Sequence, residues 1–163
     1  MKKKGKKEKI PVEHAKCVWG LLCSISSIDQ ERNNISLFNV IEQFNIPIDF
    51  FTKQKEEGKP LLAMYPHEVV LCWRRTLDIA ISNEEILADS KIKTVDPSGK
   101  ILHETLAPLK FPSGIKTLRS RFIMQGIMAS STGMYVHQVQ IKLPNQDEFK
   151  TVLEIPFEIT TNA

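Results

Sequence analysis

The sequence lacks the features that define several large classes of protein. Its three cysteines, Cys17, Cys23 and Cys72, are odd in number and form no Cys-x-x-Cys pair, which argues against a disulfide framework or a zinc site and favours a reducing compartment. No apolar run approaches the roughly 20 residues of a membrane-spanning helix. The apolar segment at 17–25 has polar flanks and no cleavage site after it, so it predicts a buried strand rather than a secretory signal. We therefore expect a cytoplasmic protein with no membrane span.

Motifs that bind phosphate, bind metal or perform catalysis are also missing. The sequence contains no glycine-rich phosphate loop and no Gly-x-Ser-x-Gly elbow, and its serines beside glycine are typical of turns. The four histidines, at positions 14, 67, 103 and 137, do not have the spacing of metal ligands. From these absences we expect no metal, no cofactor and no enzymatic activity.

Positive charge is concentrated at the beginning of the chain. The formal net charge is +3, but without the six lysines and one glutamate of the first nine residues it is near −2. We expect residues 1–10 to form a disordered basic tail. Two interpretations stay open: a solvated end, or weak contact with nucleic acid or an anionic surface through release of counterions. The lysines concerned are Lys2, Lys3, Lys4, Lys6 and Lys7.

Short stretches of alternating apolar and polar residues, separated by turn signals, fill the chain from 11 to 163. The segment Asp-Pro-Ser-Gly at 96–99 lies between two β-rich arms and predicts a hairpin. Pro156 interrupts the last alternating segment and cannot donate to a ladder, which favours an edge strand there. About eight strands and no βαβ alternation predict a single all-β domain, a two-sheet antiparallel β-sandwich.

Two further segments carry specific expectations. Thr52 to Lys59 is a charged, glycine-containing excursion, which predicts a loop or a short helix and a place where binding residues often lie. In the β-rich stretch around Trp73, the neighbouring Arg74 and Arg75 must point to opposite faces of a strand.

Tyr135 and His137 share one strand face with Val139, Ile141 and Leu143. The favoured interpretation is that both are inward-facing residues, each with a hydrogen-bond partner in the core. The alternative is that tertiary structure brings a carboxylate to them, which would complete the site of a hydrolase.

The most suggestive polar segment is Lys-Thr-Leu-Arg-Ser-Arg-Phe at 116–122. Arg119 and Arg121 project from the same strand face, with Lys110 and Lys116 close in sequence, and make a flat cationic patch suited to carboxylate or phosphate. The alternative is an ordinary solvated face.

Five segments occur in a fixed order between residues 14 and 160: LLCSISSID, NNISLFNVIEQF, VVLCWR, KTVDPSGKIL and TGMYVHQVQI. Their order resembles a family of small, mostly uncharacterised bacterial proteins that carry a domain of unknown function. The resemblance implies a compact β-sandwich and supplies no catalytic residues; Asn39 stands where we expect a glycine. The late Gly-x-Tyr segment is also similar to immunoglobulin-like domains, with His137 in place of their cysteine.

The sequence therefore predicts a non-enzymatic binding module that uses end loops or a sheet edge. A protein partner is the first expectation, and the strand ending in PFEITTNA is expected to pair with a second copy in a homodimer. The alternative is binding of nucleic acid or an anionic surface through the lysine tail and the arginine patch. A hydrolase is the third possibility.

Overall fold

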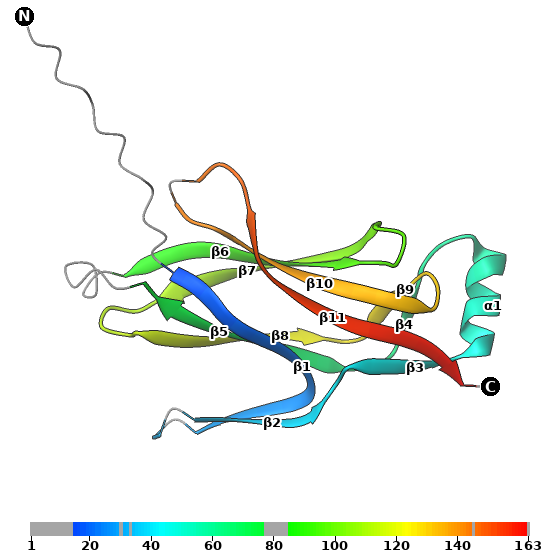
Figure 1. Ribbon diagram of the computed structural model, residues 1–163, viewed down its shortest axis with the longest axis horizontal. Helices are drawn as coiled ribbons and strands as arrows, with labels where there is room; N and C mark the ends of the chain where they lie inside the picture. Colours follow the sequence, from blue (N-terminus) through cyan, green and yellow to red (C-terminus); the bar gives the residue numbers. More distant parts are fainter. Residues whose placement is uncertain (1–14, 30, 33, 77–84, 145, 163) are drawn as a thin grey trace, which may run out of the picture.

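A computed structural model describes residues 15–29, 31–32, 34–76, 85–144 and 146–162. The basic tail expected at 1–10 lies outside these residues. Within the described ranges the chain forms eleven strands and one helix (Figure 1), which confirms the all-β class. The strands follow the predicted alternation: in β6 (Ile86–Val95) every second residue is buried, from Ile86 to Thr94. Such alternation places one face of each strand in the core and the other outside.

Two larger sheets and one small sheet make up the fold. The four-stranded sheet has the order β2 (Asn34–Val40), β1 (Ala15–Asp29), β5 (His67–Arg75), β8 (Thr117–Met124). The five-stranded sheet has the order β3 (Gln43–Pro47), β11 (Lys150–Asn162), β10 (Gly133–Lys142), β6, β7 (Ile101–Phe111). The small sheet pairs β4 (Leu61–Ala63) with β9 (Ile127–Ala129).

This arrangement differs from the expected two-sheet sandwich of about eight strands. The described residues contain eleven strands, and the sheets curl into a half-barrel. One reason is that the β-rich stretch at 35–44 is divided between β2 and β3, which belong to different sheets. A second reason is that β4 and β9 pair through only three residues each, too few to leave an alternation in the sequence.

A single core cluster joins the two larger sheets. Its largest fully buried side chains include Trp73 from one sheet and Phe111, Tyr135 and Phe157 from the other. Burying each such side chain contributes on the order of 1.5–3 kcal/mol. Trp73 therefore anchors the core from the side of the four-stranded sheet.

The excursion after Pro47 contains the helix α1 (Ile48–Glu57), so the short helix is the correct one of the two alternatives expected at 52–59. The helix ends at Gly58, which has a φ of 67° and donates its N–H to the Gln54 carbonyl at 3.0 Å. This left-handed end suits glycine. No helix of the described residues is long or apolar enough to cross a membrane.

Strand β1 takes part in two pairings. Residues up to Cys23 pair with β5, and residues from Cys23 onward pair with β2. Figure 1 shows that the second part of β1 bends away, so that the β1–β2 hairpin lies below the four-stranded sheet. At the end of this hairpin Asn39 has a φ of 52°. This is the left-handed region that glycine adopts freely and asparagine tolerates, and Asn39 is the position where a glycine was expected.

The end of β11 is not the free edge that the sequence predicted. Glu158–Asn162 pair in parallel with Gln43–Pro47 of β3, while the other side of β11 pairs with β10. The pairing with β3 covers only these last residues, and among the described residues no strand pairs with that side of β11 before Glu158. Pro156 fits because the pairing with β3 begins only at Glu158, whose N–H donates to the Glu42 carbonyl. The missing N–H of Pro156 would point to that same side, before the paired stretch starts.

Candidate functional site

Tyr135 holds two turns together. Its hydroxyl accepts hydrogen bonds from the backbone N–H groups of Ser130 and Ser131, both at 3.0 Å, and donates to the Ser131 carbonyl at 2.7 Å. The Ser130 hydroxyl in turn donates to Asp96 Oδ2 at 2.7 Å. Tyr135 is fully buried, and its hydroxyl is used in these bonds. Its role is to connect the turn before β10 with the turn after β6.

Asp96 organises the predicted hairpin turn, which the structure confirms between β6 and β7. Its Oδ1 accepts from the backbone N–H groups of Ser98 and Lys100, both at 2.9 Å, and from the Ser98 hydroxyl at 2.6 Å. Burial raises the pKa of Asp96, but these bonds and the one from Ser130 outweigh it, so the pKa lies below its usual value. The carboxylate is therefore structural and stays charged.

His137 is fully buried and contacts a hydroxyl rather than a carboxylate: its Nδ1 lies 3.1 Å from Thr94 Oγ1. Its ring stacks on His67 from the opposite sheet, with 6.2 Å between ring centroids. Burial, together with the smaller effect of the positive charges that His67 and His103 can carry, lowers the pKa of His137 to about 3. A neutral, enclosed imidazole without a carboxylate partner favours the structural interpretation over a hydrolase site.

The cysteines also lack the surroundings of a reactive group. Burial raises the pKa of Cys17 to about 12, and the neighbouring Cys72 adds to this effect. Burial likewise raises the pKa values of Cys23 and Cys72. These thiols are protonated at neutral pH and are therefore poor nucleophiles. Within the described residues no group of three or more His, Cys, Asp or Glu side chains is placed to hold a metal ion.

Cationic side chains gather on the outer face of the four-stranded sheet. Arg119 and Arg121 of β8 share this face and lie opposite Cys72 and Val70 of β5. The same register places Arg74 on this face, opposite Thr117. Lys16 of β1 lies opposite Arg74 on its other side. We call this surface, made by Lys16, Arg74, Arg119 and Arg121, the basic face.

Among the described residues, the carboxylate of Glu68 on β5 shares the outer face with these cations, and it takes part in two contacts. Its Oε1 lies 3.9 Å from Arg121 Nη1, and its Oε2 accepts a hydrogen bond from the Ser26 hydroxyl. Arg121 also donates to the Ser26 carbonyl at 3.4 Å. These contacts attach the β1–β2 hairpin to the sheet. The Arg121 side chain is still 40% exposed.

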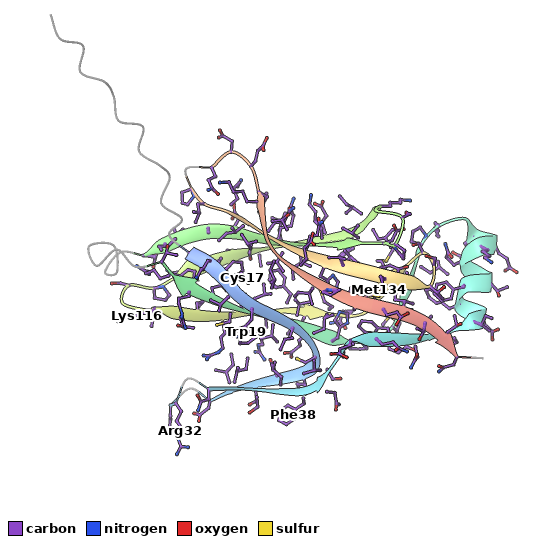
Figure 2. The ribbon with its side chains drawn as sticks, viewed as in Figure 1. Cys17, Trp19, Arg32, Phe38, Lys116 and Met134 are labelled. Atoms are coloured by element: carbon purple, nitrogen blue, oxygen red, sulfur yellow. The ribbon has the colours of Figure 1, made fainter. Side chains whose placement is uncertain are left out.

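The two predicted lysines occupy different places. Lys116 directly precedes β8, and Figure 2 shows it at the end of the sheet, beyond the strands that carry the basic face. Lys110 is on β7 of the other sheet, where its Nζ lies 2.9 Å from Glu85 Oε2. Lys110 is close to the arginines in sequence, but the chain passes from one sheet to the other between β7 and β8. The structure therefore separates Lys110 from Arg119 and Arg121.

Arg74 and Arg75 point to opposite faces, as expected. Arg74 is exposed, whereas Arg75 is buried and donates to the carbonyl of Pro112 at 3.2 Å. The sequence alone did not assign Arg74 or Lys16 to the cationic patch. The alternation predicts that residues adjacent in sequence point to opposite faces of the sheet. Which residues of β1, β5 and β8 share a face depends on the register of these strands.

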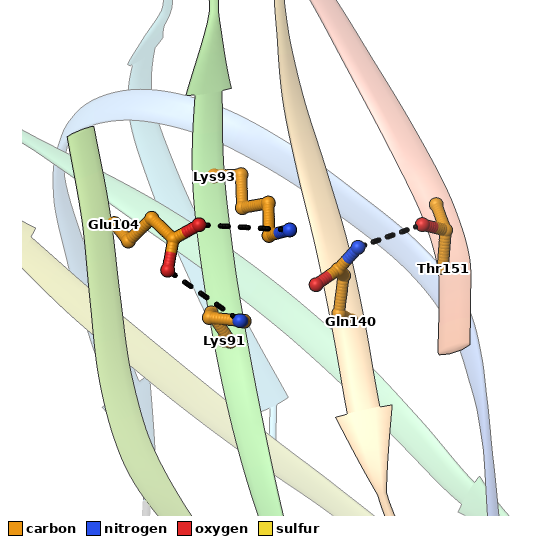
Figure 3. A network of polar contacts seen from close by, with 5 residues as sticks. All are labelled: Lys91, Lys93, Glu104, Gln140 and Thr151. Atoms are coloured by element: carbon orange, nitrogen blue, oxygen red, sulfur yellow. Dashed lines mark hydrogen bonds and ion pairs between the residues drawn. The ribbon is translucent and has the colours of Figure 1, made fainter. Parts of the chain in front are cut away.

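The outer face of the five-stranded sheet provides a contrast. There Lys91 and Lys93 lie 3.4 and 3.5 Å from the two oxygens of Glu104, and Gln140 donates to the Thr151 hydroxyl at 3.0 Å (Figure 3). Lys91 and Lys93 share the one carboxylate of Glu104, and on the same sheet Lys110 and Lys142 are paired with Glu85 and Asp89, so most lysines of this face have an acidic neighbour. On the basic face, the described residues include four cations and one carboxylate, Glu68.

Apolar side chains are interspersed with the cations of the basic face. Trp19 lies opposite Cys72, and Leu21, 39% exposed, lies opposite Val70. Figure 2 shows Trp19 on the lower side of β1, where the hairpin lies. Ile123 on β8 is 67% exposed. Comparison with protein-family models and with curated proteins finds no match for this chain.

Proposed function

We propose that the protein is a non-enzymatic, cytoplasmic binding module built on a variant of the β-sandwich, and that the basic face is its interface. The observation that carries this proposal is the excess of cations over carboxylates, counted among the described residues, on the outer face of the four-stranded sheet, where Lys16, Arg74 and Arg121 are exposed. Arginine is the residue best suited to pair with carboxylates in a fixed geometry. Concentrated positive charge also raises the association rate with an acidic partner.

The partner that fits this surface best is an acidic protein segment that also carries apolar side chains. The half-buried Trp19 and the exposed Leu21 and Ile123 offer apolar contact beside the arginines. Aromatic and arginine side chains are typical anchors of protein interfaces. Nucleic-acid binding draws most of its affinity from phosphate contacts and needs no aliphatic neighbours. The chain without its first nine residues has a formal charge near −2, which does not favour a polyanion in general.

A charge reversal tests this proposal. A fluorescein-labelled peptide of alternating Glu and Leu serves as the probe, and its anisotropy is measured with the full chain at low and moderate salt. Arg74→Glu is expected to weaken binding about tenfold, which corresponds to about 1.4 kcal/mol. Arg74 is exposed, so the variant is expected to fold. Lys110→Glu is the matched control, because it makes the same change of charge on the other sheet.

Three outcomes would contradict the proposal. Equal weakening by Arg74→Glu and Lys110→Glu would show a general charge effect rather than a defined face. Stronger binding of a single-stranded DNA oligomer than of the peptide, with the same loss in Arg74→Glu, would assign the face to nucleic acid. Equal binding of poly-glutamate and the Glu-Leu peptide would remove the role of the apolar side chains.

A further inference from the structure

A pocket of about 320 Å³ lies at the seam between the two larger sheets. It is lined by residues of β6, β7, β8, β4 and β9 and of the segment joining β8 to β9. We call it the seam pocket. The residues used below are Thr94, His103, Thr105, Met124, Ile127 and Met128. Its volume is within the range of sites for small ligands.

The pocket exists because the inner side of β7 is covered over only part of its length. Phe111 and Leu109 lie opposite the buried Ile86 and Ala88 of β6, and both are buried. Further along the same inner side come Thr105 and His103, opposite Ile92 and Thr94. Thr105 is half-buried and His103 is exposed. Polar residues therefore occupy the inward-facing positions where this strand borders the pocket.

The polar end of the pocket consists of hydroxyl groups with spare hydrogen-bonding capacity. The buried Thr94 hydroxyl contacts His137 Nδ1 at 3.1 Å, and the Thr105 hydroxyl contacts His103 Nε2 at 2.8 Å. A hydroxyl that uses its proton in one bond can still accept another, and one that accepts can still donate. Each threonine can therefore make one more hydrogen bond toward a ligand.

Either Thr94 or His137 can be the donor in the hydrogen bond between them. His137 Nε2 is buried and has no hydrogen-bond partner among the described residues, so neither tautomer of this imidazole is imposed by a second contact. The Thr94 hydroxyl can present either a proton or a lone pair to the pocket. A ligand hydroxyl, which both donates and accepts, matches either state.

The rest of the lining determines the body of the ligand. Met124, Ile127 and Met128 contribute apolar surface, and methionine side chains adapt to irregular shapes. None of the described residues that line the pocket is Lys, Arg, Asp or Glu, so a charged ligand would lose hydration without gaining a permanently charged counterion. We propose that the seam pocket binds a small neutral molecule with an apolar body and one hydroxyl group, such as an alcohol or a phenol.

Methionine-methyl NMR of the full chain tests this inference with phenol as the probe. Phenol is expected to shift the methyl signals of Met124 and Met128 in a saturable way. The signal of Met134, which is 54% exposed and is not a lining residue, is the internal control. Toluene has the same ring without a hydroxyl and is expected to bind about fivefold more weakly, the effect of one net hydrogen bond.

Two variants at Thr105 make the test specific. Thr105→Phe is expected to fill the pocket and abolish the shifts, whereas Thr105→Val keeps the shape and is expected to reduce the preference for phenol over toluene. Equal affinities of the wild type for phenol and toluene, or unchanged binding in Thr105→Phe, would overturn the proposal, as would the absence of any shift. Arg74→Glu is expected to leave phenol binding unchanged, so this result is independent of the proposed function.

Discussion

At the scale of single residues, the histidine pair is the most demanding feature of the core. His67 and His137 come from opposite sheets and stack on each other, and both are almost completely buried. His67 Nδ1 lies 2.7 Å from the Tyr65 carbonyl, which can only accept, so His67 carries its proton on Nδ1. Burial lowers the pKa of both imidazoles. The fold therefore depends on both rings remaining neutral.

This dependence predicts loss of stability in mild acid. Unfolding restores the ordinary pKa of His137, 6.5, from its folded value of about 3. Above pH 6.5 the ring is neutral in both states and contributes no pH dependence. Between about pH 6.5 and 3 the unfolded chain binds the proton first, so this group lowers the free energy of unfolding by up to about 1.4 kcal/mol per pH unit.

Urea unfolding of the wild type and of His137→Phe between pH 7.5 and 4.5 measures this effect. The variant retains His67 and His103 but lacks the fully buried ring whose pKa is lowered to about 3, and a shallower fall of its stability with decreasing pH is expected. Parallel curves for the two proteins would show that His137 is not held neutral in the folded state.

At the scale of elements, the small β4–β9 sheet depends on one close approach of backbone. A Cβ atom added at Gly126 would lie 2.3 Å from the Ala63 carbonyl oxygen, and Ala63 pairs with Ile127 in this sheet. At Gly20, where β1 passes the core, an added Cβ would lie 2.7 Å from the ends of the Leu71 and Leu153 side chains. A leucine methyl group can move aside, whereas the backbone at Ala63 is held by its strand.

Gly126→Ala is therefore expected to destabilise the protein more than Gly20→Ala. The cost at Gly126 is expected to be about 2–3 kcal/mol or more, because the β4–β9 pairing must open, and about 1 kcal/mol at Gly20. The midpoints and slopes of denaturant unfolding for the two variants provide the comparison. A larger loss at Gly20 would show that β1 is packed more rigidly than the small sheet.

At the scale of the whole molecule, the sequence predicts the class of fold but not its assembly. Alternation identifies most of the strands, and the turn at 96–99 is correct in place and type. The parallel pairing of β3 with the end of β11, and the bend of β1, arise from contacts distant in sequence. For the same reason the common face of Arg119 and Arg121 could be predicted, whereas the addition of Lys16 and Arg74, and the separation of Lys110, could not.

The central claim is that the basic face, rather than the charge-balanced face of the other sheet, is the binding surface. Backbone amide shifts of the full chain during titration with the Glu-Leu peptide test it most directly. The account predicts that the perturbed amides lie in residues 15–23 of β1, in β5 and in β8, while those of Lys91 and Lys93 stay unchanged. Perturbations centred on Lys91 and Lys93, or confined to residues 1–10, would contradict it.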